Sequence, residues 1–535
     1  MRKTKKNYNI HCDCRGVGAG ETIASILDYR GIDNPEHFFN PTQQDLLPLH
    51  RMRNIDQAAY LVEKAIADKQ KIHVMFDTDT DGISAGAIMT RYLKRFTDNV
   101  DVSINDGKKH GLVEQDLSRF DDAELLIIVD SLDNTVQQYK ALADNGVQII
   151  ILDHHAIKNG IPYDNYVCLV SSQRDYGNKA LSGSGVTWKF CKYLDVILET
   201  DFADDFTDLA ATGIIADMMD MTNMENRYIV SEGLKQIHNL AIKKIVGGFE
   251  FNSTAVAFSI APLINAANRM NQNDIALKAF LTDDNKEALT LVKQLKACKE
   301  SQNQEVERIM PSAIEQCELQ IDRKMMVVET NTKFGINGLI ANKLLEKYQR
   351  PILCLNHFDG KYLGSMRAIG VEDFRAICNG SHLAQADGHE LASGISIRED
   401  NMTAFQQYVE DNLVLDLKTD YDIDARIDVG DINRDLIERV KAIDKVSGSG
   451  CKPLTFYIDG LENYIIGQMS DYKHLVIKPY DFLYIIKWNW QGSFEEMEDY
   501  SLMNEEIRAV GSLDCGFLGR KFVLKMICDD IEVVD

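Results

Sequence analysis

Apolar runs and polar segments alternate along the first third of the chain in a way that predicts strands connected by helices. Three apolar runs predict strands at 72–76, 124–130 and 147–152. Between these runs, apolar residues recur at helical spacing, from about 83 to 92 and again up to about 143. Strands that alternate with helices at this spacing form βαβ units, so we expect a parallel sheet. The strands are apolar throughout, as is typical of a sheet covered on both faces.

Beyond this segment the pattern changes several times, and each change suggests a boundary. Helical spacing and a cap at Asn34 and Pro35 predict a helical lead-in, and a polar stretch without Gly or Pro before Pro311 predicts a long helix. A second α/β segment and a series of short β-rich pieces, typical of a small barrel, follow. The expected parts are a lead-in at 1–70, an α/β domain at 71–274, a connecting helix at 275–322, a second α/β domain at 323–415 and a β-rich domain at 420–535.

Composition limits the class of protein. The 535 residues include 45% hydrophobic and 26% charged residues, which is ordinary for a soluble globular protein. The basic start MRKTKKNYNI lacks the apolar core of a signal peptide, and no apolar run approaches the length of a membrane span, so we expect a cytoplasmic protein. Eleven scattered cysteines without paired CxxC units predict free thiols.

The formal net charge of -24 argues against a protein that coats nucleic acid with a broad basic surface. It leaves open an enzyme with a narrow basic groove, because net charge averages over faces that never meet a substrate. The class of partner must therefore be inferred from the candidate site.

Three carboxylates follow the first predicted strand in the sequence VMFDTDTDGIS. Asp77, Asp79 and Asp81 stand at every second position, and Gly82 then opens a helix. They lie at the carboxyl end of a strand, where open parallel sheets bind their ligands. Three crowded carboxylates repel one another unless a cation lies between them, which favours a divalent metal site. The alternative is a solvated acidic turn.

Further carboxylates and imidazoles follow other apolar segments. Asp130 ends the second strand, Asp153, His154 and His155 follow the third, and Asp217 follows a later apolar segment. Each has a simple alternative explanation, namely a helix cap, a polar surface pair or the start of a turn. Together they form a mixed oxygen and nitrogen set suited to two manganese or magnesium ions rather than zinc. We expect Asp130, the central member, to bridge the ions.

Two divalent ions about 3.5–4 Å apart are the arrangement that catalyses phosphoryl hydrolysis in many enzymes. They lower the pKa of a water molecule and neutralise the phosphate. The sequence therefore predicts a metal-dependent enzyme of phosphoryl hydrolysis.

The motifs DTDTDG, LIIVD, LDHHA and GIIADMMDMTNMENR, in this order, resemble those of the DHH phosphoesterase superfamily. Within it they resemble the RecJ branch of single-strand-specific 5′ to 3′ DNA exonucleases, as do ALSGSGVTWKF, APLINAANRM and the lead-in RGIDNPEHFFNP. The resemblance covers nearly the whole chain. It implies an α/β fold with a parallel-sheet DHH domain, a long connecting helix, a smaller α/β DHHA1 domain and a C-terminal OB-like β-barrel.

The resemblance also assigns roles to residues of the metal centre. It implies that the metal ligands are Asp77, Asp79, Asp81, Asp130, His154 and Asp217. His155 would touch the scissile phosphate or assist the leaving group, and Asp153 would orient the histidines. The catalytic set is thus His155, Asp130 and Asp153, with two Mn²⁺ ions expected and Mg²⁺ as the alternative.

The resemblance implies substrate contacts outside the metal centre. Arg269 would hold a phosphate with its guanidinium fork, and the segments around it and around GSMRA and DGHELASG would contribute further contacts. These candidate substrate-binding residues are Asn265, Arg269, Ser365, Arg367, Gly388 and His389. The alternatives are a surface salt bridge for Arg269 and ordinary turns for the glycines.

KVSGSGCKPLTF and KHLVIKP resemble the RecJ OB-fold domain, which would bind a single strand by stacking bases on aromatic rings. The main candidates are Trp488, Trp490 and Lys473, with Tyr457, Tyr464, His474 and Lys478 as further ones. The alternative is strong, because aromatic residues of small barrels usually fill the core.

Three functions follow from these observations. The favoured one is a metal-dependent 5′ to 3′ exonuclease on single-stranded DNA, acting in recombination, repair or replication. The second is a phosphodiesterase for short oligoribonucleotides or cyclic dinucleotides, and the third is a non-catalytic DNA-binding replication scaffold. The resemblance implies single-stranded DNA as the partner, a helicase or single-strand-binding protein as candidate protein partners, and a monomer. Departures from the family pattern at Met75, Asn268 and Asp387 affect substrate geometry more than metal binding.

Overall fold

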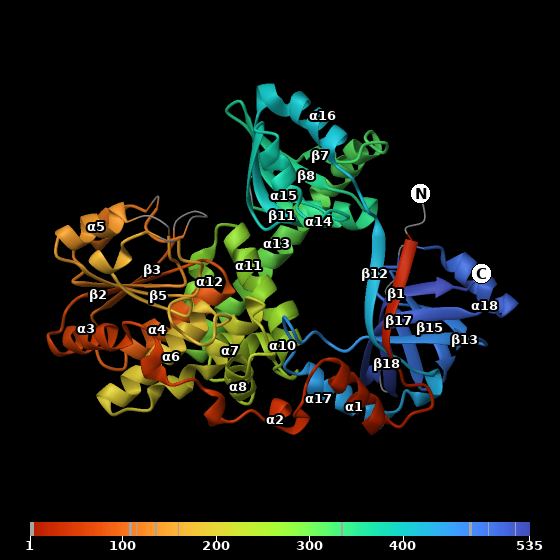
Figure 1. Cartoon of the computed structure of the whole chain (residues 1–535), viewed down its shortest axis with the longest axis horizontal. Helices are drawn as coiled ribbons and strands as arrows, with labels where there is room; N and C mark the ends of the chain where they lie inside the picture. Colours follow the sequence, from red (N-terminus) through yellow and green to blue (C-terminus); the bar gives the residue numbers. More distant parts are fainter. Residues whose placement is uncertain are drawn as a thin grey trace. The chain divides into compact units, whose positions relative to one another are not determined.

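A computed structural model describes residues 5–105, 110–113, 115–133, 136–158, 160–332, 335–469, 473–490, 492–518 and 521–534 of the chain (Figure 1). The chain forms two compact units. One comprises Tyr8–Ala261, Leu277–Ala288 and Tyr421–Asp535, and the other comprises Met1–Asn7, Pro262–Ala276 and Leu289–Asp420. None of the helices in these described ranges is long and apolar enough to cross a membrane.

The first unit contains the predicted parallel sheet, whose five strands run in the order β3-β2-β4-β5-β6. Its strands are β2 (Ile72–Phe76), β3 (Val100–Ile104), β4 (Leu125–Val129), β5 (Gln148–Asp153) and β6 (Cys168–Ser171). Every neighbouring pair is parallel. All residues of β2 and β4 are buried, which confirms the α/β architecture and the sheet covered on both faces.

Helices cover both faces of this sheet (Figure 1). On one face, Tyr139 and Leu142 of α5 (Gln137–Asp144) pack against Leu126 and Ile128 of β4. The other face contacts the helices α3 (Ile55–Ala67), α4 (Thr80–Leu93) and α6 (Gly183–Leu198). Helix α7 (Thr207–Ala216) packs against α4 and α6, and α8 (Met224–Gly233) packs against α7. The carboxyl ends of β2, β4 and β5 therefore lie near the starts of α4 and α6.

A β-rich region belongs to the same unit and forms an eight-stranded sheet in the order β1-β12-β13-β17-β18-β16-β15-β14. Its strands are β1 (Lys5–Asp13), β12 (Lys418–Arg426), β13 (Phe456–Leu461), β14 (Ile465–Met469), β15 (His474–Tyr480), β16 (Leu483–Lys487), β17 (Ile507–Leu518) and β18 (Lys521–Val533). This confirms the predicted β-rich C-terminal segment. Closure into an OB-like barrel stays a prediction.

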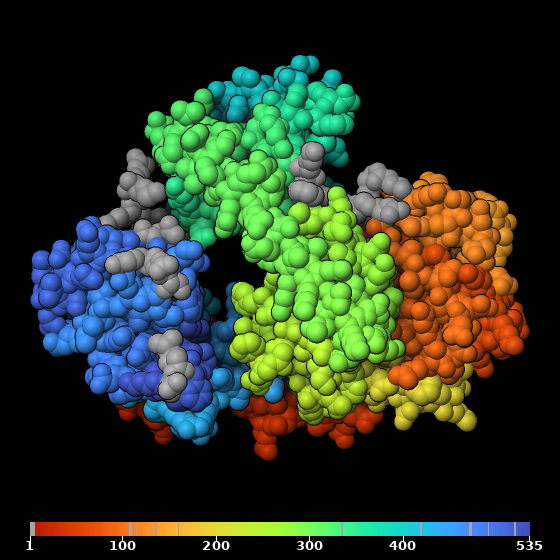
Figure 2. All heavy atoms as spheres, turned by 180° about the vertical axis from the view of Figure 1, so that it is seen from behind, coloured from red at the N-terminus to blue at the C-terminus, as the bar shows by residue number. Residues whose placement is uncertain are grey.

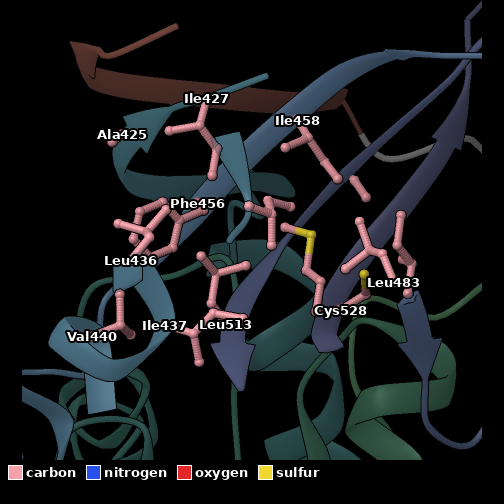
Figure 3. Close-up of a cluster of buried hydrophobic side chains, with 14 of the residues drawn as sticks. Ala425, Ile427, Leu436, Ile437, Val440, Phe456, Ile458, Leu483, Leu513 and Cys528 are labelled. Atoms are coloured by element: carbon pink, nitrogen blue, oxygen red, sulfur yellow. The ribbon is translucent and has the colours of Figure 1, made fainter. Parts of the chain in front are cut away.

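One hydrophobic core joins the sheet of this region to two helices. Figure 3 shows Leu436 and Val440 of α17 (Arg434–Asp444) pointing toward Phe456 of β13, with Leu513 and Cys528 of the neighbouring strands nearby. Apolar spacing of i, i+4 along α17 places its buried side chains on one face, which is why this short helix can cover the sheet. The same core includes Ile23, Ile26 and Leu27 of α1 (Ala19–Tyr29).

The lead-in that the sequence predicts as helical begins with a strand. Strand β1 is paired with β12, and its alternating Tyr8 and Ile10 pack against Tyr421 and Tyr457. The alternation extends over too few residues of the largely polar sequence KKNYNIHCD to predict a strand. Helices α1, α2 (Pro35–Phe39) and α3 follow, and Asn34 caps α2 as predicted. Figure 2 shows red residues of this segment lying against blue residues of the C-terminal region.

The second unit is a smaller α/β body with a five-stranded sheet in the order β10-β11-β9-β8-β7. Its strands are β7 (Met326–Glu329), β8 (Ile352–Phe358), β9 (Lys361–Arg367), β10 (Ala384–Gly388) and β11 (Ala392–Arg398). Helices α14 (Asn337–Tyr348), α15 (Phe374–Gly380) and α16 (Met402–Asn412) complete it. The predicted connecting helix is realised as α12 (Asn273–Leu281) and the 34-residue α13 (Asn285–Glu318), which contains Pro311.

Candidate metal centre

The acidic turn after β2 is organised by the start of α4. Asp77 follows the strand directly, and Asp79 caps the helix by accepting a hydrogen bond from Gly82 N at 2.9 Å. A Cβ at position 82 would lie 2.6 Å from Asp77 O, so only glycine allows this turn. Burial, and then the charges of Asp77 and Asp81, raise the pKa of Asp79 to about 7. The three carboxylates are thus crowded enough to oppose ionisation.

Asp81, in the first turn of α4, directs its carboxylate at the amino terminus of α6 and is 1% exposed. Its carboxylate accepts hydrogen bonds from Gly183 N at 2.7 Å, Ser184 N at 3.1 Å and Ser182 Oγ at 2.9 Å. The small residues of the motif ALSGSG allow this approach, and a Cβ on Gly213 would lie 2.1 Å from Asp81 Oδ1. The start of a helix stabilises a negative charge, so Asp81 is held in a fixed position.

Asp130 follows β4 and occupies the centre of the site. Its φ of 54° lies in the left-handed region, and its backbone N donates a hydrogen bond to Leu152 O at 2.9 Å. The residue is 2% exposed, and its Oδ1 accepts no hydrogen bond from the described residues. Burial, and then the charges of Asp81 and Asp79, raise the pKa of Asp130 well above its usual range. A buried carboxylate oxygen without a donor is the environment that a bound cation satisfies.

His154 joins the carboxylates into two groups. Its Nε2 lies 3.2 Å from Asp130 Oδ1, 3.5 Å from Asp217 Oδ2 and 4.0 Å from Asp81 Oδ2. Asp81, His154 and Asp217 form one set, and Asp130, His154 and His155 form another, each with its ligand atoms within 4.8 Å of one another. Burial, and then the charge of Asp81, raise the pKa of Asp217 to about 8. These donors fit hard divalent ions with mixed oxygen and nitrogen ligation.

Asp153 holds His155 in one orientation. His155 Nδ1 lies 3.0 Å from Asp153 Oδ1, and the other carboxylate oxygen accepts a hydrogen bond from Leu132 N at 2.7 Å. Burial alone would lower the pKa of His155, but the charge of Asp153 and their hydrogen bond raise it to about 9. Asp153 is fully buried, and although burial alone would raise its pKa, the charge of His155 lowers it to about 2. With Nδ1 directed at Asp153, Nε2 is available to another partner.

His110 belongs to this site, although sequence reasoning did not select it. Its Nδ1 lies 3.9 Å from Asp77 Oδ2, and its ring centroid lies 4.6 Å from that of His155. It follows β3 at the same sheet edge as Asp77 and Asp130. A histidine shortly after a strand of the parallel sheet was the pattern that could have identified it.

The second unit gathers the arginines that resemblance assigns to the substrate. Arg269 ends α11 (Ala261–Arg269), with Asn265 one turn before it, and Arg367 ends β9. A Cβ on Gly338, in the first turn of α14, would lie 2.6 Å from Arg367 Nη2 and 3.6 Å from Ser365 Oγ. Burial, and then the charge of Arg367, lower the pKa of Arg269. The structure therefore brings Arg269, Arg367 and Ser365 together.

A further cation accompanies these arginines. Burial, and then the charges of Arg269 and Lys343, lower the pKa of Lys299 on α13. Lys299 was not selected from the sequence, because lysines spaced along a long polar helix are usually solvated.

Gly388 and His389 form the turn between β10 and β11. Gly388 has a φ of 129°, and His389 N donates a hydrogen bond to Ala392 O at 3.2 Å. Because Ala392 pairs with Arg367, this turn ends beside that arginine in the sheet.

The candidate strand-binding residues of the β-rich region differ in exposure. Trp490 packs against the core, and its backbone N donates a hydrogen bond to Lys473 O at 3.0 Å. Tyr457 and Tyr464 are buried as well. Trp488 is 42% exposed and meets His474 edge to face. The core-filling alternative thus describes three of these aromatic residues, and Trp488 is the exposed one.

Four exposed aromatic residues that sequence reasoning did not select lie at the ends of two hairpins in this region. Tyr480 and Phe482 stack with ring centroids 5.4 Å apart, and Phe517 and Phe522 meet edge to face at 5.5 Å. Leu524 N donates a hydrogen bond to Phe482 O at 2.9 Å, so the two pairs are neighbours. We call these four residues, which are 41% to 72% exposed, the hairpin aromatic cluster.

The chain is similar in sequence to several known proteins. Residues 71–214 match the DHH family, N-terminal domain. The SPbeta prophage-derived protein YorK of Bacillus subtilis (strain 168), named as a single-strand DNA-specific exonuclease, is 30% identical over 422 residues, which cover 71% of this chain and 72% of YorK. The single-stranded-DNA-specific exonuclease RecJ of the same strain is 28% identical over 404 residues, covering 71% of this chain and 50% of that protein.

Two solved structures give the same result for the fold. RecJ of Thermus thermophilus in complex with Mn²⁺ has a TM-score of 0.80 at 23% identity, covering 100% of this chain and 80% of that one. A structure of exonuclease RecJ bound to manganese has a TM-score of 0.58 at 27% identity, covering 68% of this chain and 96% of that one. The arrangement of strands and helices is therefore shared over the length of the chain.

Proposed function

Because the chain belongs to the RecJ-like branch of the DHH family and is a nuclease, we propose that it removes nucleotides from the 5′ end of single-stranded DNA. The motif resemblance found in the sequence is thereby confirmed. The observation that carries the proposal is the buried Asp130 Oδ1, which has no described hydrogen-bond donor and lies 3.2 Å from His154 Nε2. A role in DNA recombination, repair or replication, in which such ends arise, belongs to the same proposal.

We propose two divalent ions as the cofactors. Asp81, Asp130, His154 and Asp217 would hold them together with Asp77 and Asp79. Burial and neighbouring carboxylates raise the pKa values of Asp79 and Asp217, and a bound cation would stabilise their charged forms. Two RecJ structures contain Mn²⁺, which makes it the first choice, and a further one contains Mg²⁺. When bound, such ions supply a hydroxide near neutral pH and neutralise charge on the phosphodiester.

The protein's own residues would orient the scissile phosphate. Asp153 fixes the Nδ1 side of His155 at 3.0 Å, which leaves Nε2 to donate a hydrogen bond to a phosphate or leaving oxygen. The backbone donors at the start of α6 hold Asp81, so the ligand set is organised before the substrate arrives.

The second unit would bind a phosphate of the strand. Beyond the effect of burial, the charge of Arg367 lowers the pKa of Arg269, and the charge of Arg269 lowers the pKa of Lys299, so an anion among these groups would be stabilised. Ser365 and the first turn of α14 would add neutral donors to that phosphate.

In the β-rich region we propose that Trp488 and the hairpin aromatic cluster stack on the bases of longer strands. Lys521 Nζ, which donates a hydrogen bond to Asp481 O at 2.6 Å, and the guanidinium of Arg434, 5.6 Å above the Phe522 ring, supply positive charge beside these rings. Candidate protein partners such as a helicase or a single-strand-binding protein would deliver the end of a strand.

The alternative functions differ in how they use the β-rich region. A phosphodiesterase for short oligoribonucleotides or cyclic dinucleotides has no need of the hairpin aromatic cluster. A non-catalytic scaffold would not need the carboxylates around Asp130. The presence of both features supports the exonuclease.

The test is a Mn²⁺-dependent digestion of matched single-stranded DNA and RNA labelled at the 5′ or the 3′ end. We expect short 5′-labelled products from DNA at the earliest times, with gradual shortening of the 3′-labelled strand. Hydrolysis of dinucleotides alone would favour the small-substrate phosphodiesterase, and binding without cleavage would favour the scaffold.

A further inference from the structure

A short segment of the β-rich region packs against the loop that carries Asp217. We call residues 446–451 the glycine segment and residues 217–222 the Asp217 loop. Asp220 and Ser449 form an isolated parallel β-bridge, in which Met221 N donates a hydrogen bond to Ser449 O at 2.8 Å. The glycine segment is itself closed by hydrogen bonds from Gly448 N to Cys451 O at 3.0 Å and from Cys451 N to Gly448 O at 3.2 Å. The two backbones are therefore directly connected.

The contact requires glycine at two positions. A Cβ on Gly448 would lie 2.4 Å from Met221 Cγ. Gly450 has a φ of +70°, and a Cβ there would lie 2.4 Å from Asp220 Oδ1 and 3.0 Å from Thr222 Cγ2. The same Asp220 oxygen accepts hydrogen bonds from Thr222 N at 2.9 Å and Thr222 Oγ1 at 2.7 Å, so it cannot move without loss. The glycines thus allow an approach that any other residue would prevent.

Arg227 links the same two segments through its side chain. It is 1% exposed, and its Nη1 lies 3.3 Å from Val446 O and 3.4 Å from Met221 O. Its guanidinium also lies 3.6 Å from the centre of the Phe38 ring. One buried cation therefore contacts the lead-in, the Asp217 loop and the glycine segment together.

Asp217 is less enclosed by its surroundings than Asp81 and Asp130 are. Its backbone N donates to Gly213 O at 2.9 Å, which fixes it to the end of α7, and the next residue, Met218, has a φ of 55°. Its side chain is 32% exposed, whereas those of Asp81 and Asp130 are almost fully enclosed. Asp217 thus stands at the junction between the last turn of α7 and the loop that the glycine segment contacts.

We infer that the glycine segment is a positioning element, which holds the Asp217 loop so that the Asp217 carboxylate meets His154 at the metal centre. The inference rests on the proposed metal site. It gives the β-rich region a part in ion binding although none of the proposed ligands belongs to that region.

The test measures Mn²⁺ affinity by titration calorimetry on the full chain. Gly450→Ala should weaken Mn²⁺ binding roughly 10-fold, as is typical when a residue that supports a ligand is lost. The matched control is Gly460→Ala in the same region, because Gly460 has a φ of +67° but nothing within 4 Å of its Cβ position. Both variants carry the same kind of backbone strain, so weaker Mn²⁺ binding in Gly450→Ala than in Gly460→Ala supports the inference.

Two further variants separate the possible failures. Adding Asp220→Ala to Gly450→Ala removes the oxygen that the new methyl group meets and should restore part of the Mn²⁺ affinity. If Gly450→Ala does not fold, Gly448→Ala, which adds no positive φ, serves in its place. Asp217→Asn should weaken Mn²⁺ binding by itself, and an unchanged affinity there would overturn the proposed metal site. If Asp217→Asn weakens Mn²⁺ binding but Gly450→Ala and Gly448→Ala leave the Mn²⁺ affinity unchanged, the inference is overturned and the proposed metal site stands.

Discussion

Gly183 lies so close to Asp130 that a Cβ at this position would be 2.4 Å from the carboxylate oxygen Oδ1. Gly183→Ala should displace Asp130 and lower both Mn²⁺ affinity and DNA cleavage by at least about 10-fold, the usual scale for a displaced ligand. Calorimetric titration with Mn²⁺ measures the first effect directly. The control is Gly20→Ala in the first turn of α1, where nothing lies within 4 Å. Equal Mn²⁺ affinity in the two variants would contradict the proposal that Asp130 binds the ions.

Asp130→Asn tests the same carboxylate without changing its size. Cleavage should fall to background because a proposed metal ligand is lost, whereas binding of a single strand should persist. Without ions the variant should melt at a higher temperature than the parent chain, because the charge of a buried carboxylate repelled by Asp81 is removed. Differential scanning calorimetry, with a chelator and with Mn²⁺, measures the melting temperatures of both proteins. Cleavage that persists in an uncontaminated preparation would rule out the two-ion mechanism.

Arg367→Lys tests the phosphate site of the second unit. A lysine keeps the charge but cannot form the two parallel hydrogen bonds of a guanidinium, so KM for single-stranded DNA should rise about 10-fold. Thermal stability should change little. Steady-state cleavage of strands with and without a 5′ phosphate is the measurement, and an unchanged KM for both would exclude Arg367 from substrate binding.

Phe517→Ala tests the hairpin aromatic cluster. Removing a ring that is 72% exposed should weaken binding of long single strands by roughly 1–3 kcal/mol and leave dinucleotide hydrolysis unchanged. Fluorescence anisotropy with strands of increasing length gives the affinities. Phe249→Ala, which removes an 86% exposed ring elsewhere, is the control and should have no effect. If both variants bind long strands equally well, the cluster does not contact them.

His73 makes the parallel sheet sensitive to acid. It lies on β2, and its Nε2 is 2.8 Å from Ser103 Oγ of β3. Burial lowers the pKa of His73 to about 4 from its usual 6.5, so protonation favours the unfolded chain. The resulting loss of stability begins below pH 6.5, grows as the pH falls toward 4, and is on the order of 1–2 kcal/mol at pH 5. His73→Gln should reduce this loss. Urea unfolding at pH 7.5 and pH 5 is the measurement, and an identical decrease in both proteins would contradict the assignment.

The sheet and the metal centre could be predicted from the sequence because both follow from short segments and their order along the chain. Apolar strands end in Asp77, Asp130 and Asp153, and parallel strands bring their carboxyl ends to one edge. The structure accordingly places Asp81, Asp130 and His154 within a few ångströms.

What could not be predicted depends on tertiary contacts and on turn geometry. Trp488 and Trp490 look equivalent in the sequence, yet one is exposed and the other packs against the core. Asn489 between them has a φ of 52°, which breaks the alternation of an extended strand. The same limit applies to His110, whose partners come from distant segments. The glycines at 448 and 450 resemble an ordinary turn until the Asp217 loop is seen against them.

The pairing of β1 with β12 has a consequence for how the chain is made. These strands are neighbours in one sheet, yet β12 begins about 400 residues after β1 ends. A ribosome that adds 5–20 residues per second needs roughly 20–80 s to cover that distance. During this interval the amino-terminal strand has left the ribosome but its partner does not yet exist, so its backbone edge must be shielded by a chaperone or by water. The parallel sheet around Asp130 can assemble in the meantime, and the β-rich sheet is completed last.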